Sequence, residues 1–141
     1  EEALTALGRE ETTQYRAYIG YDEELSHQIY AGSDFLLMPS RVEPCGLNQL
    51  YSLRYGTIPM VRSTGGLKDT VIDFGDEGGY GIRFDQASVD DICYSVNRAI
   101  NLYRDTGHIK LLRNRMMNLD FSWDRSARQY IDLYERLITT I

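Results

Sequence analysis

Cysteine and histidine are scarce in this sequence. Its 141 residues include two cysteines, Cys45 and Cys93, which are too few for a disulfide framework and lack the spacing of metal ligands. The low cysteine count fits a reducing compartment. The two histidines, His27 and His108, lie far apart on predicted helices, and we expect both at the surface. The sequence therefore predicts no metal site.

Long apolar runs and an excess of positive charge are also lacking. The longest apolar stretches, such as residues 35–39, are far shorter than the ~18 residues that a membrane-spanning helix needs. Asp and Glu (21) outnumber Lys and Arg (15), and the net charge of −6 argues against a general nucleic-acid surface. The sequence thus predicts no membrane and no nucleic acid as partner, although a local anion site stays open.

What is present is the composition of one globular domain. Apolar residues make up 43% of the chain and charged residues 26%, which rules out disorder as its main state. The length fits a single domain at roughly 100–200 residues per domain. We find no repeat, low-complexity segment or internal linker.

Helix-like and strand-like patterns alternate over the first 85 residues or so. Strands are expected at residues 15–20, 35–38, 58–62 and 80–84. Helices are expected at residues 2–8, 23–31, 47–54, 67–72, 108–117 and 123–138, and a long helix after Ser88, with Asp22 and Ser88 as caps and Gly32 and Gly56 as ends. The apolar run at residues 35–38 is typical of a strand that is buried on both faces of a parallel sheet.

This alternation predicts an α/β domain with a mostly parallel sheet of about four strands and flanking helices. The C-terminal third is expected to be helical only. Its apolar stripes, such as Ala127, Ile131, Tyr134 and Ile138, are expected to belong to the core.

The carboxyl ends of parallel strands are where ligands bind, so the strand-to-helix junctions are the candidate sites. At residues 39–48, Gly46 opens a helix whose free N–H groups and dipole favour an anion. Glu43 stands beside it and can accept hydrogen bonds from sugar hydroxyls, which together suit a sugar phosphate. The alternative is that Glu43 and Arg41 are solvated loop residues and that Gly46 only permits a turn.

Two more junctions leave alternatives open. Gly65 and Gly66 let the backbone approach a ligand closely, or they simply form a turn. Tyr21 follows a predicted strand and either stacks on a base or forms a half-buried edge of the core. Cys45 lies near a helix N-terminus, but no His or Lys neighbours it in sequence, which disfavours a nucleophile.

Two strings in these junctions carry a family resemblance. Residues 43–47 read Glu-Pro-Cys-Gly-Leu, and residues 64–70 read Thr-Gly-Gly-Leu-Lys-Asp-Thr. Residues 19–22 (Ile-Gly-Tyr-Asp) and 121–123 (Phe-Ser-Trp) match as well. In these motifs the chain resembles bacterial glycogen synthase and plant starch synthase over essentially its whole length.

The resemblance implies a GT-B fold, in which two Rossmann-like domains face each other across a cleft. It implies transfer of glucose, with retention, from ADP-glucose (or UDP-glucose) to the non-reducing 4-hydroxyl of an α-1,4-glucan, without a metal or other cofactor. It also implies a cytoplasmic enzyme in a bacterium, or a plastid enzyme in a plant.

The resemblance further implies roles for particular residues. Glu43 corresponds to a catalytic glutamate that binds the donor glucose, and Tyr21 to a tyrosine that stacks on adenine. The backbone amides at Cys45, Gly46, Leu47 and Asn48 correspond to those that meet the glucose hydroxyls and the distal phosphate, and Thr64, Gly65 and Gly66 to a loop bordering the same cleft.

Departures from the family pattern shape the domain prediction. Many related retaining transferases have a second Glu where Tyr51 stands, and its absence favours the glycogen and starch synthase branch. The Lys-x-Gly-Gly-Leu motif of the N-terminal domain is missing, and so is an Arg/Lys pair that precedes this segment. We therefore expect residues 1–141, which begin without Met, to be part of the C-terminal nucleotide-sugar domain. The N-terminal domain, which we expect as the segment's partner, would be absent and the segment inactive alone.

The sequence allows two other interpretations. The first is a stand-alone nucleotide- or sugar-binding module without catalysis. The second is a response-regulator-like signalling domain, which would need an acidic residue at the end of the central strand, where Pro39 and Ser40 stand. The sequence disfavours the second.

Overall fold

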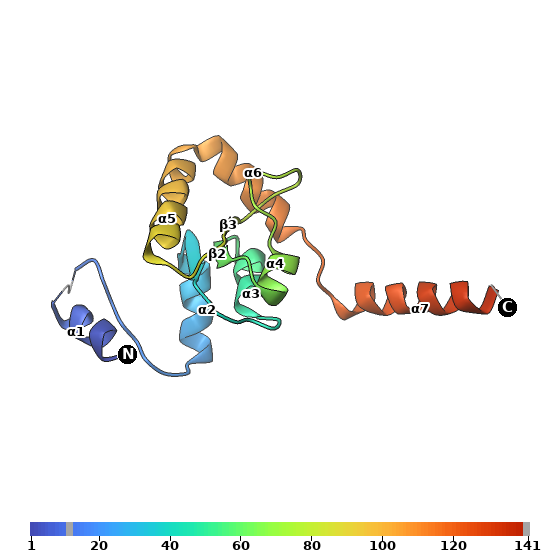
Figure 1. Cartoon of the computed structure of the whole chain (residues 1–141), viewed down its shortest axis with the longest axis horizontal. Coiled ribbons are helices and arrows are strands. Elements are labelled where there is room, and N and C mark those ends of the chain that lie inside the picture. Colours follow the sequence, from blue (N-terminus) through green and yellow to red (C-terminus); the bar gives the residue numbers. More distant parts are fainter. Residues whose placement is uncertain (11–12, 140–141) are drawn as a thin grey trace.

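The computed structural model of the chain describes residues 1–10 and 13–139. Within these residues it contains seven helices and three strands. In chain order they are α1 (Glu2–Glu10), α2 (Glu23–Gly32), β1 (Phe35–Met38), α3 (Asn48–Tyr55), β2 (Ile58–Arg62), α4 (Gly65–Thr70), β3 (Ile82–Phe84), α5 (Val89–Arg104), α6 (Thr106–Met117) and α7 (Trp123–Thr139). Figure 1 shows that the strands and α2 to α6 form one body, from which α1 and α7 stand apart.

The three strands form one parallel sheet in the order β1-β2-β3. Phe35 of β1 lies opposite Ile58 of β2, and Met60 of β2 lies opposite Ile82 of β3. Helix α3 connects β1 to β2, because parallel strands need a crossover connection. All three strands therefore end at the same edge of the sheet, where the loops after β1 and β2 are neighbours. The predicted α/β class with a parallel sheet and flanking helices is confirmed.

Two apolar clusters form the core, one on each face of the sheet. Side chains alternate along β2, so that Ile58 and Met60 belong to one cluster and Val61 to the other. The buried members of the larger cluster are Leu53, Ile58, Met60, Tyr80, Ile82, Ala99, Leu102, Ile109, Leu112 and Met116. Those of the smaller are Met38, Val61, Leu67 and Val71. Because each large aliphatic side chain contributes about 1.5–3 kcal/mol when buried, these clusters hold α3, α4, α5 and α6 on the sheet.

The helix ends are set by local chemistry that the sequence predicted. The side chain of Asp22 accepts a hydrogen bond from the backbone N–H of Leu25 at 2.9 Å, and that of Ser88 accepts one from Asp91 at 3.2 Å. Gly56 ends α3 in the left-handed region at φ 81°, which a residue with a Cβ adopts only with strain. Both predicted N-caps and this helix end are confirmed.

The prediction of a strand at residues 15–20 is wrong. The structure describes these residues as irregular, and its sheet has three strands rather than about four. A strand needs a partner edge for its backbone hydrogen bonds. This segment instead connects α1 to α2 away from the sheet (Figure 1).

The expectation that residues 35–38 are buried on both faces also needs correction. Met38 is buried, but the side chain of Leu37 is 41% exposed. In the described structure β1 is an edge strand and pairs only with β2. An apolar run indicates a strand whose side chains can be buried. The elements that pack against the strand decide how much of each side chain is covered.

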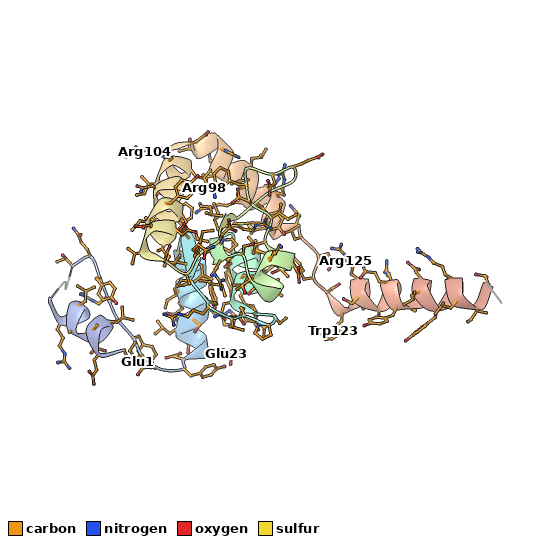
Figure 2. The ribbon with its side chains drawn as sticks, in the orientation of Figure 1. Glu1, Glu23, Arg98, Arg104, Trp123 and Arg125 are labelled. Atoms are coloured by element: carbon orange, nitrogen blue, oxygen red, sulfur yellow. The ribbon has the colours of Figure 1, made fainter. Side chains whose placement is uncertain are left out.

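Helix α7 contradicts the expectation that every apolar stripe is core. None of its described side chains is buried, and Trp123 is 89% exposed. Figure 2 shows Trp123 and Arg125 at the start of α7, apart from the body. Helical periodicity shows that one face is apolar, but burial requires a surface that packs against that face. No helix in the described part of the chain is long and apolar enough to cross a membrane.

Smaller corrections concern element ends and the histidines. Relative to the expectations, α2 includes Gly32 and ends before Ser33, α3 starts at Asn48, α4 starts at Gly65, and β3 starts at Ile82. His27 is half-buried and packs edge-on against Tyr51, with ring centroids 5.5 Å apart. His108 is half-buried and packs against Phe74 at 5.8 Å. Neither histidine is a simple surface residue, because aromatic neighbours cover part of each ring.

Candidate functional site

The candidate site lies at the carboxyl edge of the sheet. The loop over residues 39–47 follows β1, and the turn over residues 63–64 follows β2. Arg62, at the end of β2, connects the loops that follow β1 and β3 through hydrogen bonds from its guanidinium group. Its Nε donates to the carbonyl of Asp85 at 3.0 Å, and its Nη1 donates to the carbonyls of Ser40 and Arg41 at 3.4 and 2.5 Å.

The two glycines at the start of α4 lie directly against the loop that carries Glu43. The N–H of Gly66 donates to the carbonyls of Glu43 and Pro44, both at 3.2 Å. A Cβ on Gly65 would overlap the carbonyl oxygen of Glu43, and one on Gly66 would lie 2.5 Å from the carbonyl oxygen of Cys45. Both glycines are therefore required by a close approach of two backbones. The surface that they approach is the chain's own loop, so they position this loop in addition to forming the turn.

Glu43 sits within this loop as a half-buried carboxylate. Its Oε2 accepts a long hydrogen bond from the hydroxyl of Ser40 at 3.4 Å. An ionised carboxylate has about four acceptor positions, so the side chain can accept further hydrogen bonds, such as those of sugar hydroxyls.

The N-terminus of α3 lies a few residues further along the same loop. Gly46 adopts φ +75°, and Leu47 is the N-cap residue with no capping hydrogen bond from its side chain. The first N–H groups of α3, from Asn48 onward, therefore lack a side-chain cap. Free N–H groups and the positive end of the helix dipole make such a terminus suitable for a phosphate.

Cys45 and Tyr21 occupy different settings. Cys45 is an exposed free thiol between Glu43 and the start of α3. The side chain of Tyr21 is 89% exposed, so the alternative of a half-buried core edge does not hold in this structure. Tyr21 precedes Asp22, the cap of α2. Because α2 leads back to the beginning of β1, its first residues, which Glu23 marks in Figure 2, point toward the carboxyl edge of the sheet.

The structure thus brings together Glu43, Cys45, Gly46, Leu47, Asn48, Thr64, Gly65 and Gly66. Tyr21 lies at the start of a separate helix and is not held against them. Within the described residues, no group of three or more His, Cys, Asp or Glu side chains could hold a metal ion.

Sequence reasoning missed Gln49. Its side chain is fully buried in the first turn of α3 and binds the loop and α4 at once. The sequence does contain a sign of this role. Gln49 is a long amide side chain three residues after Gly46, and it shares one helix face with Ser52 and Leu53, which are buried.

Proteins with sequences similar to this chain are glycogen synthases. No protein-family model matches the chain. The glycogen synthase of Flavobacterium johnsoniae is 59% identical over 138 residues, which are 98% of this chain and 29% of that protein. Glycogen synthase 2 of Agrobacterium fabrum is 48% identical over 143 residues, with 98% and 28% covered. The chain matches a segment of a glycogen synthase. It spans about 29% of the length of these curated relatives.

Solved structures agree with this match. The catalytic domain of starch synthase IV from Arabidopsis thaliana, described as bound to ADP and acarbose, aligns with a TM-score of 0.85 and 38% identity. The alignment covers 98% of this chain and 30% of that one. Sucrose-phosphate synthase from Thermosynechococcus elongatus aligns with a TM-score of 0.66 and 23% identity, which concerns the fold alone. Both are GT-B glycosyltransferases. The resemblance to glycogen and starch synthases is confirmed, while the roles of single residues in this segment stay predictions.

Proposed function

We propose that this glycogen synthase segment is part of the C-terminal nucleotide-sugar domain of a retaining glucosyltransferase. The complete enzyme would transfer glucose from ADP-glucose to the non-reducing 4-hydroxyl of an α-1,4-glucan. Its N-terminal domain, supplied by the remainder of a longer chain, would carry most contacts to the acceptor. The 59% identity to a glycogen synthase and the ADP described in the starch synthase structure support this proposal. A cytoplasmic location, or a plastid in a plant, belongs to the same proposal.

One observation carries the proposal: a half-buried carboxylate and an uncapped helix N-terminus share one loop, and a Gly-Gly turn is packed against that loop. Glu43 offers acceptors for the hydroxyls of glucose, whereas the N–H groups at the start of α3 offer donors for a phosphate. A nucleoside diphosphate sugar needs both kinds of group at neighbouring points. Asn48, the first residue of α3, follows Glu43 by five residues, which supports such an arrangement.

The chemistry assigned to these groups is electrostatic. As the diphosphate leaves, the glucose gains positive character that resembles an oxocarbenium ion, and a fixed carboxylate at Glu43 stabilises this charge. The N–H groups of α3 stabilise the developing charge on the departing phosphate in the same way. Glu43 need not act as a general base, because on this proposal it activates neither water nor a hydroxyl.

The base of the donor is assigned to Tyr21. An exposed aromatic ring at the start of α2 offers a face for stacking, and this face is available to adenine or uracil alike. The preference for ADP-glucose over UDP-glucose therefore rests on the relatives rather than on this ring.

A donor competition on the complete enzyme tests the proposal. Labelled ADP-glucose and UDP-glucose are supplied separately and together, with glycogen as primer, and incorporation into the polymer is measured. We expect incorporation from ADP-glucose that unlabelled UDP-glucose suppresses only weakly. Failure to extend glycogen from either donor, with binding of nucleotide retained, would favour a stand-alone binding module and overturn the assignment.

A further inference from the structure

Gln49 makes an unusual set of contacts for a fully buried polar side chain. Its exposed fraction is 0%. The single Nε2 atom donates to the carbonyl oxygens of Cys45 and Gly46, both at 3.0 Å, and lies 3.2 Å from the hydroxyl oxygen of Thr70. Gln49 thus connects α3, the loop before it, and the end of α4.

These contacts fix the orientation of the amide group. Two carbonyl oxygens face one end of the amide, and a carbonyl can only accept a hydrogen bond, so this end must be the NH₂ group. The other end, Oε1, is buried and has no hydrogen-bond partner in the described structure. It packs against Gly46, where an added Cβ would lie 2.5 Å from it.

The contact with Thr70 continues to the Gly-Gly turn. The hydroxyl of Thr70 donates to the carbonyl of Gly66 at 2.6 Å, so its oxygen is left to accept from Gln49, whose two N–H bonds are shared among the three acceptors. The N–H of Gly66 in turn donates to the carbonyl of Glu43. Hydrogen bonds therefore link Gln49 through Thr70 and Gly66 to Glu43, and they also link Gln49 directly to Cys45 and Gly46. The backbone of residues 43–49 closes this circuit.

An amide is a costly choice for stability alone at this place. A buried carbonyl without a partner loses its hydrogen bonds to water, and an apolar side chain of similar volume would avoid that cost. The amide adds a donor group that holds two backbone segments, the loop before α3 and the end of α4. The predicted contacts to glucose and phosphate lie on this loop and at the start of α3.

We propose that Gln49 is a positioning residue for the donor-sugar site, acting through the loop over residues 43–46 and the start of α4. This inference rests on the proposed function, because it takes Glu43 and the N-terminus of α3 to hold the donor. Gln49 does not touch the substrate. It sets the backbone from which Glu43 and the N–H groups approach the donor, and displacement by about 1 Å can lower a rate by about 10²-fold.

Gln49→Met in the complete enzyme is the test variant, since Met has a similar volume and no donor. We expect the kcat of glucosyl transfer to fall about 30- to 100-fold. The melting temperature should fall modestly at most, because the loss of the donor is offset by removal of the unpaired Oε1. Binding of ADP alone should weaken less than kcat falls, because ADP meets the N-terminus of α3 but lacks the glucose that Glu43 holds. Amide hydrogen exchange at Gly66 should become faster, and this measurement does not depend on activity.

Ser52→Ala is the matched control. Ser52 is also fully buried on α3, and its hydroxyl donates to the carbonyl of Gln49 at 2.8 Å within the helix, without reaching the loop. Its loss should lower the melting temperature without lowering kcat more than about twofold. Thr70→Val breaks the circuit on the α4 side. Its effect on kcat should be partial and should not add to that of Gln49→Met, because both act through the same contacts.

The outcomes separate this inference from the function on which it rests. A Gln49→Met enzyme with the kcat of the Ser52→Ala control, and with unchanged exchange at Gly66, overturns the positioning role. If Gln49→Met lowers only the melting temperature, its role is structural and the inference again fails. A wild-type enzyme that transfers no glucose instead refutes the proposed function, while hydrogen exchange at Gly66 still tests whether Gln49 holds the loop.

Discussion

Glu43 is the residue on which the proposed chemistry depends most. In the complete enzyme we expect Glu43→Ala to lower turnover by about 10²–10³-fold, the usual cost of removing one preorganised electrostatic group. Folding should be retained, because within the described residues the carboxylate is held by one long hydrogen bond from Ser40. Turnover at saturating donor and a melting curve provide the measurements, with Glu43→Gln as the variant that keeps the size. Near-normal turnover would remove Glu43 from the mechanism, and a collapsed melting temperature would make its role structural.

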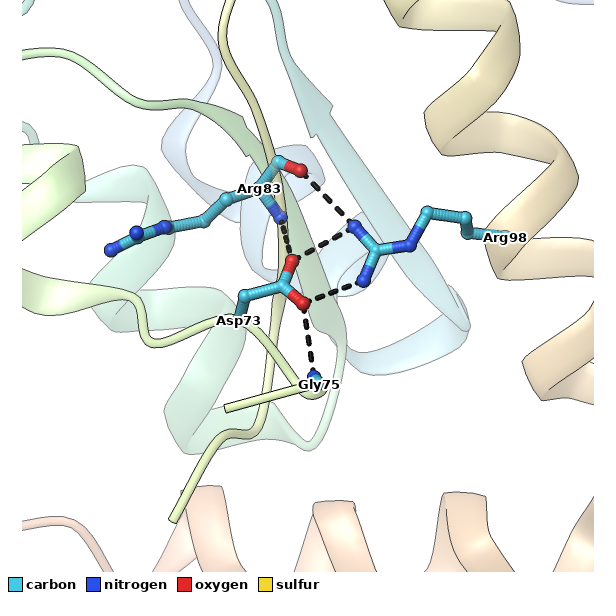
Figure 3. A network of polar contacts seen from close by, with 4 residues as sticks. All are labelled: Asp73, Gly75, Arg83 and Arg98. Carbon is cyan, nitrogen blue, oxygen red and sulfur yellow. Dashed lines mark hydrogen bonds and ion pairs between the residues drawn. The ribbon is translucent and has the colours of Figure 1, made fainter. Parts of the chain in front are cut away.

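Asp73 shows a different use of a carboxylate, in stability. Figure 3 shows it accepting hydrogen bonds from the backbone N–H groups of Gly75 and Arg83 at 2.9 and 2.8 Å, and from the guanidinium of Arg98 at 2.9 and 2.6 Å. Partial burial alone would raise the pKa of Asp73. The hydrogen bonds from Arg98, Arg83 and Gly75 outweigh it, so the pKa lies below its ordinary value.

This lowered pKa predicts a pH dependence of stability. A carboxyl whose pKa is lower in the folded state stabilises the fold above its unfolded pKa of about 3.9, and the contribution is lost as pH falls through the folded pKa. We expect Asp73→Asn to reduce the free energy of unfolding by roughly 2–4 kcal/mol at pH 7, and by less below pH 3. Urea titrations at both pH values measure this difference.

The neighbouring Glu77 supplies the control for Asp73. Glu77 is exposed in the same connection between α4 and β3, and Glu77→Gln should change the unfolding free energy by less than about 0.5 kcal/mol at either pH. If the two variants behave alike, the carboxylate of Asp73 does not contribute as the structure indicates.

At the scale of elements, the docking of α4 on the loop after β1 requires glycine. We expect Gly66→Ala to destabilise the protein by about 2 kcal/mol or more, since its Cβ would meet the backbone of Cys45 and neither backbone can move independently. Gly32→Ala is the contrast, because nothing lies within 4 Å of an added Cβ at the end of α2. That change should be neutral or stabilising by up to about 1 kcal/mol. Chemical denaturation compares the two, and equal effects would contradict the close approach.

The start of α2 carries the prediction for the donor base. Tyr21→Ala in the complete enzyme should raise the KM for the donor at least several-fold, because stacking of a base on an aromatic ring is worth about 1–3 kcal/mol. The melting temperature should not change, since the ring packs against little of the described chain. Tyr18→Ala, which removes another exposed tyrosine just before α2, serves as the control. An unchanged KM would show that Tyr21 does not stack on the donor.

At the scale of the whole molecule, residues 1–141 alone should show no glucosyl transfer. On the proposed assignment the acceptor is held by another domain, and alignment of two reactants can supply about 7–11 kcal/mol of the barrier lowering. Incorporation of labelled glucose into glycogen is measured for the purified segment beside the complete enzyme. Measurable incorporation by the segment would contradict the division of the site between two domains.

Several features followed from the sequence alone because they depend on neighbours along the chain. Asp22 and Ser88 were predictable caps, since a side-chain oxygen reaches an N–H only three residues away. Gly56 was a predictable helix end for a similarly local reason. The runs at residues 35–38 and 58–62 were predictable strands, and the junctions that follow them were predictable neighbours, because the carboxyl ends of parallel strands meet at one edge.

Only the tertiary structure decided the features that depend on partners distant in sequence. Residues 15–20 have a strand-like pattern but form no strand in the described structure, because no sheet edge accepts their hydrogen bonds. The apolar stripe of α7 has the periodicity of a core helix, yet its described side chains pack against no surface that buries them. Gln49 became significant only when Thr70, 21 residues away, came within 3.2 Å of it. The local sequence determines which hydrogen-bonding groups and apolar faces a segment has. Whether these groups are paired and these faces buried depends on the distant residues that the fold places against them.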